Sequence, residues 1–226
     1  MGNWINEGFQ GIVMPVGAVN AGDPWRAYEE VTAFGMAHTE SFGVEGAGVN
    51  AAAYAIAFQK ETSVDTVLKT VLAVAKDGTK LAIEDVLAVT DPTDSLEKFV
   101  EKTRLAFLPY LQLAPVHLKK GNPETGKTLR EATNIGRPSR IACVENVPIA
   151  FAALKYGQGN YQKTLKAALF YGRDAESIAA VATSILAAIN PQAGAPQGLK
   201  ATLDTVNRRN HAQFAAHFFE TVKKNI

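Results

Sequence analysis

Three oxygen-bearing side chains follow a glycine in the segment Gly172-Arg-Asp-Ala-Glu-Ser177 and have the composition of a partial metal site. The glycine ends one predicted helix, and Asp174, Glu176 and Ser177 begin the next. Because Asp174 and Ser177 are one helical turn apart, their oxygen atoms can converge on one point. Such oxygens suit Mg²⁺ or Mn²⁺, and too few nitrogen or sulfur donors lie near to favour zinc. These donors alone leave an octahedral shell incomplete.

The same residues are also those of an ordinary helix start. An aspartate such as Asp174 is a common N-cap, a glutamate such as Glu176 suits a first turn, and Ser177 is an ordinary surface residue. The helix dipole favours negative charge at this end of a helix. Because capping patterns of this kind are common, the spacing alone does not separate a metal site from a capped helix.

The composition indicates a globular chain that binds neither nucleic acid nor a membrane. Of the 226 residues 47% are hydrophobic and the formal net charge is +1, which predicts a single domain over residues 1–226. The basic residues are scattered and form no stripe that could neutralise a phosphate backbone. No apolar run approaches the ~20 residues that span a bilayer, and the N-terminal residues lack the pattern of a secretion signal. With the single cysteine Cys143, these features predict a cytoplasmic protein.

Apolar residues recur with a helical period along almost the whole chain. Two clear stripes lie within residues 64–75 and 178–189. Between residues 45 and 58, small side chains occupy all faces and predict a buried, closely packed helix. The predicted helix starts include Asp23-Pro24, Ser63 and Asn146-Val-Pro148. Because strict alternation of apolar and polar residues is hard to find, the predicted fold class is all-α.

The chain resembles the ADP-ribosylglycohydrolase family in two regions. The region from Glu145-Asn-Val-Pro148 to residue 180 is similar to the family's C-terminal signature. Members usually carry Asp-Thr-Asp-Thr-Ile-Ala where this chain has Asp174-Ala-Glu-Ser-Ile-Ala179. Earlier elements follow one another in the family's order. They are Pro15-Val-Gly-Ala-Val-Asn-Ala-Gly-Asp-Pro24, Ala27, His38-Thr39, the alanine-rich helix after these residues, and Ala75-Lys-Asp-Gly-Thr79.

The resemblance implies a compact, all-α orthogonal helical bundle with a binuclear Mg²⁺ or Mn²⁺ centre. It implies hydrolysis of the glycosidic bond of an ADP-ribosyl or nucleoside-like substrate, either a ribosylated small molecule or an ADP-ribosylated protein. Carried over residue by residue, the metal ligands are Asp174, Glu176 and Ser177. The family's second aspartate is a glutamate here, longer by one methylene. A displacement of about 1 Å can lower a rate about a hundredfold.

Arg173 and His38 are the candidate substrate-binding residues. Arg173 adjoins the predicted ligands, and its guanidinium can clamp a phosphate or a ribose hydroxyl, or form a salt bridge that fixes the helix start. His38 lies where the family often has a histidine, and capping or packing is its alternative role. Glu145 can order the metal ligands from a second layer or simply begin a helix. We assign no catalytic residue.

The family's other metal-binding elements have no counterpart in the sequence. Members carry a Gly-Asp element and a Thr-Asp-Asp motif near their N-terminus, whereas this chain has no Asp-Asp pair. We therefore expect the chain to correspond to the C-terminal two-thirds of the family fold and to lack half of the metal ligands. One hypothesis is a heteromer in which a partner chain supplies Thr-Asp-Asp. The alternative is a non-catalytic binding or structural subunit that kept the fold.

Overall fold

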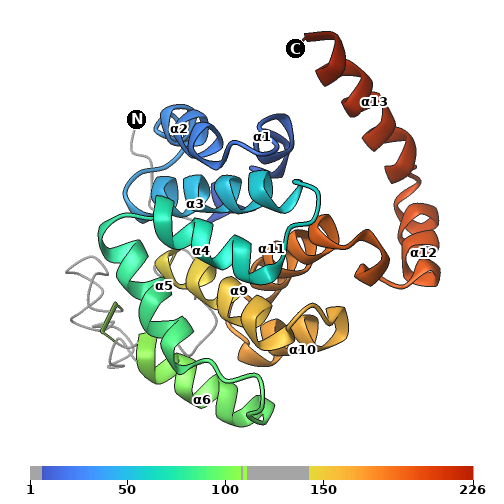
Figure 1. Cartoon of the computed structure of the whole chain (residues 1–226). Coiled ribbons are helices and arrows are strands. Elements are labelled where there is room, and N and C mark those ends of the chain that lie inside the picture. The colour runs from blue at the N-terminus through green and yellow to red at the C-terminus, as the bar shows by residue number, and fades with distance from the viewer. Residues whose placement is uncertain (1–6, 108, 111–142, 226) are drawn as a thin grey trace, which may run out of the picture. The chain divides into compact units, whose positions relative to one another are not determined.

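A computed structural model describes residues 7–107, 109–110 and 143–225 (Figure 1). These residues form α-helices and short 3-10 helices, with no strand among them, which confirms the predicted all-α fold class. The elements are η1 (Gly8–Gly11), α1 (Met14–Val19), α2 (Pro24–Gly35), α3 (Phe42–Ala57), α4 (Val64–Val74), α5 (Asp77–Val89), α6 (Leu96–Phe107), α9 (Cys143–Gly157), α10 (Tyr161–Tyr171), α11 (Ala175–Ile189), η3 (Pro191–Ala193), α12 (Gln197–Asn207) and α13 (His211–Asn225). Contacts divide the chain into two units, Met1–Ala193 and Gly194–Ile226. The single domain expected over residues 1–226 stays a prediction.

Two of the three predicted helix starts are confirmed, and one is wrong. The side chains of Asp23 and Ser63 accept hydrogen bonds at 3.0 and 3.1 Å from backbone N–H groups three residues further on, and so cap α2 and α4. By contrast, α9 begins at Cys143 and contains Pro148 within it. A proline there removes one helical hydrogen bond without ending the helix. As a consequence Asn146 lies inside α9, and its side chain does not cap that helix.

Helix α3 is buried along most of its length and contacts α1, α2, α4, α9 and α11 (Figure 1). This confirms the buried helix of small residues that the sequence predicted. Small residues allow the close approach of its neighbours. A Cβ at Gly48 would lie 2.8 Å from the side chain of Tyr28 on α2, and a Cβ at Gly17 of α1 would lie 2.4 Å from the Cβ of Tyr54.

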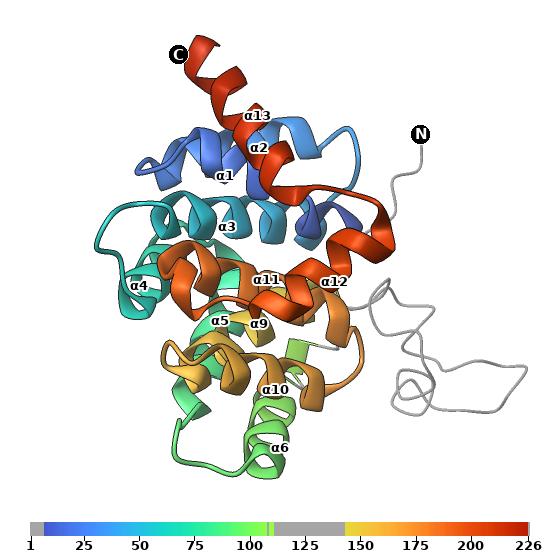
Figure 2. The same cartoon turned by 90° about the vertical axis from the view of Figure 1, so that its right-hand side faces the viewer.

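Helix α9 is the second buried helix of the first unit, and it contacts α3, α5, α10 and α11 (Figure 2). Residues 149–154 of this helix are fully buried. The two helices that follow it along the chain, α10 and α11, pack against α9 and against each other. The connection between α10 and α11 is therefore attached to a rigid, buried support.

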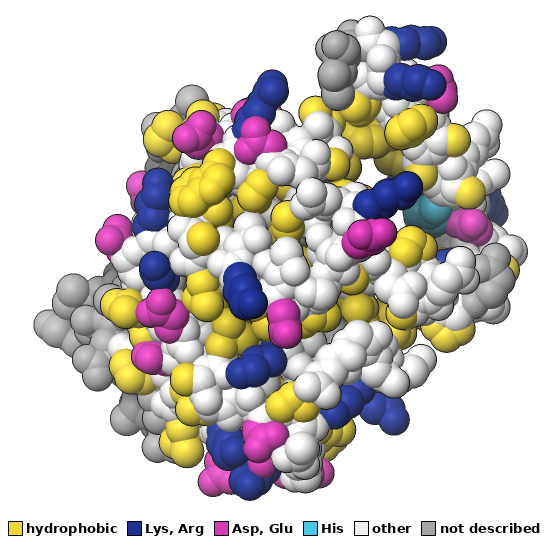
Figure 3. All heavy atoms as spheres, in the orientation of Figure 1, with side chains coloured by type: hydrophobic (Ala, Val, Ile, Leu, Met, Phe, Trp, Pro, Cys, Tyr) yellow, Lys and Arg dark blue, Asp and Glu magenta, His cyan; other side chains and the backbone are white. Residues whose placement is uncertain are grey.

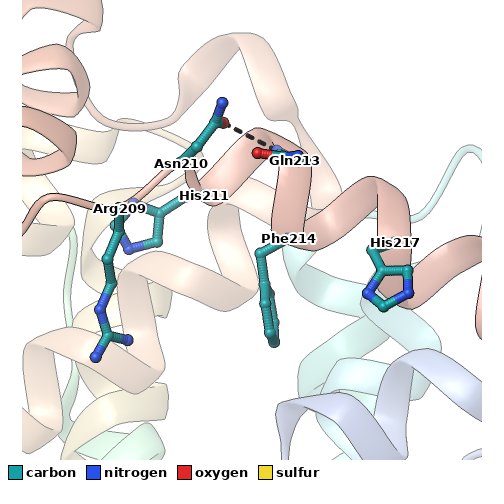
Figure 4. A pocket seen from close by; sticks show the side chains of 6 residues that line it. All are labelled: Arg209, Asn210, His211, Gln213, Phe214 and His217. Carbon is teal, nitrogen blue, oxygen red and sulfur yellow. Dashed lines mark hydrogen bonds between the residues drawn. The ribbon is translucent and has the colours of Figure 1, made fainter.

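The second unit, residues 194–226, consists mainly of α12 and α13. Arg208, in the left-handed conformation with φ 50°, ends α12. Asn210 begins α13 by accepting a hydrogen bond at 3.0 Å from the backbone N–H of Gln213 (Figure 4). Large apolar side chains of the two helices are exposed, namely Leu199, Leu203, Val206, Phe214 and Phe219. A hollow at the start of α13 is lined by Arg209, Asn210, His211, Gln213, Phe214 and His217 (Figure 4).

Charged side chains of both signs are interspersed on the face of the protein shown in Figure 3, and no basic stripe is visible there. The expectation that the protein does not bind nucleic acid stays a prediction. Among the helices that the structure describes, none is both long and apolar enough to cross a membrane.

Candidate functional site

The turn between α10 and α11 carries the predicted metal ligands on a strained backbone. Gly172 has φ 76° and ψ −151°, a combination essentially confined to glycine, and Arg173 has φ 57°. Asp174 follows at the N-cap position of α11. Glycine adopts positive φ without strain, but Arg173 does not, so contacts with the rest of the fold must hold Arg173 in this conformation.

Asp174 is buried, with 6% of its surface exposed, and its carboxylate bonds to another helix. Although the residue occupies the N-cap position, its side chain makes no capping hydrogen bond to the backbone. Instead, the side-chain amide of Asn146 on α9 donates to Oδ2 of Asp174. The hydroxyl of Ser177 also donates to this carboxylate. An ordinary helix cap therefore does not account for this aspartate.

Burial raises the pKa of Asp174, and the neighbouring carboxylates of Glu176 and Glu7 raise it further. Hydrogen bonds from Asn146 and Ser177 lower the pKa without cancelling the effect of burial. Glu7 immediately precedes η1, which contacts α11. Its Oε2 is buried and has no hydrogen-bond partner in the described part of the chain. The acids around Asp174 therefore create a negative field that favours a cation or a proton at this position.

The three predicted metal ligands differ in their surroundings. Asp174 and Ser177 are joined by a hydrogen bond, as their spacing allowed, whereas Glu176 is exposed. Within residues 7–107, 109–110 and 143–225, no group of three or more His, Cys, Asp or Glu residues is placed to hold a metal ion. The oxygens of Asp174 and Ser177 are of the kind that Mg²⁺ or Mn²⁺ prefers, but they do not complete a shell. Ligation by Asp174, Glu176 and Ser177 stays a prediction.

Glu145 of α9 forms a buried polar cluster with the residues on either side of Gly172. Its Oε1 accepts a hydrogen bond of 2.5 Å from the hydroxyl of Tyr171 and lies 3.3 Å from Nε of Arg173. Burial raises the pKa of Glu145, and the cation of Arg173 and the hydrogen bond from Tyr171 only partly offset this rise. Arg104 of α6 donates to the carbonyl of Tyr171, and its guanidinium carbon lies 5.3 Å from the centre of the Tyr171 ring.

Arg173 and His38, the predicted substrate-binding residues, both make structural contacts. Arg173 forms the salt bridge to Glu145, while its Nη1 is buried with no hydrogen-bond partner among the described residues. His38 is exposed, and its ring stacks on Phe9 at 5.4 Å and lies 4.7 Å from the ring of Phe34, measured between centroids. These contacts agree with the structural alternatives for both residues. Binding of substrate by Arg173 and His38 stays a prediction.

Sequence reasoning missed several members of this site. The hydrogen bonds from Tyr171 to Glu145, from Asn146 to Asp174 and from Arg104 to Tyr171 join residues 26, 28 and 67 positions apart. One usable signal was the position of Asn146 directly after a glutamate that belongs to the family resemblance.

The all-α fold and the acid-bearing turn agree with the resemblance seen in the sequence. The chain matches the ADP-ribosylglycohydrolase family over residues 2–225, and it belongs to that family. The match takes in essentially the whole chain and is not confined to a C-terminal part of it. Membership indicates glycohydrolase activity on ADP-ribosyl-type bonds, and the family is generally metal-dependent. Comparison with curated proteins and with solved structures gave no match.

Proposed function

We propose that the protein is a Mg²⁺- or Mn²⁺-dependent hydrolase that cleaves the glycosidic bond of a ribosyl group in an ADP-ribosylated protein or a nucleoside-like small molecule. The observation that carries this proposal is the buried carboxylate of Asp174, which stands at an N-cap position without capping. Burial disfavours the charged form of a carboxylate, and a purely structural residue there would gain by capping. Membership of the family supports the class of substrate.

Asp174, Ser177 and Glu176 hold the metal in this proposal. A bound divalent ion supplies Lewis acidity toward the ribose oxygens. Asn146 orients the Asp174 carboxylate through its hydrogen bond. The acids around Asp174 also favour positive charge, and such charge develops on the ribose as a glycosidic bond breaks.

Arg173 and His38 bind the substrate in this proposal. Arg173 belongs to the same turn as Asp174, and its buried Nη1 is a donor with no partner among the described residues. A guanidinium donor of this kind suits a phosphate or ribose oxygen. His38 stacks on Phe9 of η1, the element that contacts α11. This contact supports a place for His38 at the edge of the same site.

The remaining metal donors come, in this proposal, from a partner chain that carries Thr-Asp-Asp, so that the enzyme is a heteromer. The sequence has no Asp-Asp pair, and the part of the chain that the structure describes holds no complete group of metal ligands. The exposed position of Glu176 favours the second candidate function, a non-catalytic binding or structural subunit. Binding of metal separates the two functions.

The test combines metal binding with hydrolysis. The purified chain, alone and mixed with a candidate Thr-Asp-Asp chain, is titrated with Mn²⁺ by calorimetry. It is then given ADP-ribosylated arginine, ADP-ribosylated serine peptides and nucleosides. We expect Asp174→Asn to lower Mn²⁺ affinity by more than about a hundredfold and to abolish hydrolysis. The loss should exceed a hundredfold because that is about the largest loss caused by removing a partner of a metal ligand, and Asp174 is itself a proposed ligand.

Asp23→Asn is the matched control, because Asp23 is also at a helix N-cap and asparagine caps as well as aspartate. We expect this variant to bind Mn²⁺ and to hydrolyse substrate as the parent does. A parent chain that binds no Mn²⁺ and cleaves none of these substrates, with or without the partner, would refute the hydrolase. That result would leave the non-catalytic subunit as the function.

A further inference from the structure

Two adjacent residues of α9 hold three of the four residues from 171 to 174. The Glu145 carboxylate contacts Tyr171 and Arg173, and the Asn146 amide donates to Asp174. The contacts of Glu145 lie on both sides of Gly172, and one of them is to Arg173, the non-glycine residue with positive φ. Because α9 is among the most buried helices of its unit, it provides a rigid anchor for this turn.

Stability alone does not explain the buried carboxylate of Glu145. Taking a charge out of water carries a desolvation penalty, and replacement of a buried ion pair by apolar residues is often neutral or stabilising. Glu145 is only 2% exposed, and within the described ranges it is the acidic partner of Arg173. Arg173 has a positive φ, and a non-glycine residue keeps such a conformation only where surrounding contacts impose it.

We propose that Glu145 is a positioning residue. It holds Tyr171 and Arg173 so that the turn presents Asp174 to Asn146 in the orientation needed for metal binding. This inference rests on the proposed function only for the role of the metal. The effect of Glu145 on the conformation of the turn is measurable without any ligand.

The experiment uses the full chain with Glu145→Ala and Glu145→Gln, and it has two readouts. The first is the amide NMR spectrum of residues 172–177, and the second is Mn²⁺ affinity by calorimetry. We expect Glu145→Ala to shift the signals of this turn and to lower Mn²⁺ affinity. The decrease should not exceed the roughly 10- to 100-fold loss that follows removal of a direct partner of a metal ligand, because Glu145 acts on Asp174 only through Tyr171 and Arg173. Glu145→Gln keeps an oxygen that can accept the hydrogen bond from Tyr171. Its NMR signals and its Mn²⁺ affinity should therefore be closer to those of the parent than the values of Glu145→Ala are.

Glu45→Ala is the control, because Glu45 likewise accepts a hydrogen bond from a tyrosine, Tyr28, and one of 2.8 Å from the backbone of Lys76. A role in stability alone predicts equal effects of the two alanine variants on the 172–177 signals, and that result would overturn the proposal. Unchanged signals in Glu145→Ala would also overturn it. If Glu145→Ala does not fold, the amide NMR signals of Arg173 and Asp174 in Glu145→Gln serve as the readout in its place. Shifted signals in a chain whose parent binds no Mn²⁺ would support the positioning role and refute the metal-dependent function.

Discussion

Replacement of Gly172 by alanine tests whether the backbone of the turn after α10 controls the site. Gly172 adopts φ 76° and ψ −151°, which an L-residue rarely adopts. A Cβ at this position would lie 3.5 Å from Nη2 of Arg104, an ordinary contact distance, so the substitution introduces no clash. The expected effect therefore comes from the backbone conformation alone.

Strain of this kind costs about 1–3 kcal/mol of unfolding free energy. For a chain of this length, each kcal/mol lowers Tm by about 2–4 °C, so the expected decrease for Gly172→Ala is about 2–12 °C. Differential scanning calorimetry measures this change. Because Asp174 is two residues further on, we also expect Mn²⁺ affinity to fall as the carboxylate turns away from Asn146.

Gly159→Ala provides the control for strain without a change at the site. Gly159 has φ 85°, a Cβ added there would meet nothing within 4 Å, and the residue lies in the connection between α9 and α10. We expect a similar decrease in Tm and unchanged Mn²⁺ affinity. If Gly172→Ala melts within about 1 °C of the parent, the backbone argument is wrong. Equal losses of Mn²⁺ affinity in the two variants would show that general destabilisation, and not the turn, weakens the site.

Three further predictions concern packing, a hydrogen bond and pH. Gly17→Ala places a Cβ 2.4 Å from the Cβ of Tyr54, so it should lower the free energy of unfolding, measured in urea, by about 1–3 kcal/mol. Gly198→Ala is the control and should not lower it, because a Cβ at Gly198 meets nothing within 4 Å. Tyr54→Phe removes the 2.7 Å hydrogen bond to Ser184 between α3 and α11 and should cost about 0.5–1.5 kcal/mol. A double-mutant cycle with Ser184→Ala that shows no coupling would contradict this. Burial raises the folded-state pKa of Glu145 above its ordinary 4.5, so the folded state binds this proton more tightly than the unfolded state does. The free energy of unfolding should therefore decline as pH rises from 4.5 through the raised pKa of Glu145. Urea unfolding at several pH values should show a smaller decline in Glu145→Gln than in the parent. An equal decline in the two proteins would contradict this prediction.

Local sequence patterns predicted the fold class and several helix boundaries because the interactions concerned are local. Asp23 and Ser63 cap their helices through hydrogen bonds that span three residues, so the signal and the structure lie in the same short segment. The small residues of α3 likewise predicted its burial, since they leave no polar face for solvent. The start predicted at Asn146-Val-Pro148 was wrong because Pro148 lies inside α9, where it costs one backbone hydrogen bond. The burial of residues 149–154 against other helices can offset this cost, and a local sequence pattern does not reveal that burial.

By itself, the sequence determined that Asp174 and Ser177 would be one turn apart at the start of a helix, and that a glycine would precede them. It left open whether Asp174 caps that helix and whether Arg173 forms a salt bridge. The tertiary structure decided both points, by placing Asn146 against Asp174 and Glu145 against Arg173. The reason is physical, because a helix start depends on residues within one turn. The direction of a side chain there depends on which helix packs beside it, and the partners that α9 supplies, Glu145 and Asn146, are 26 and 28 residues from Tyr171 and Asp174 along the chain.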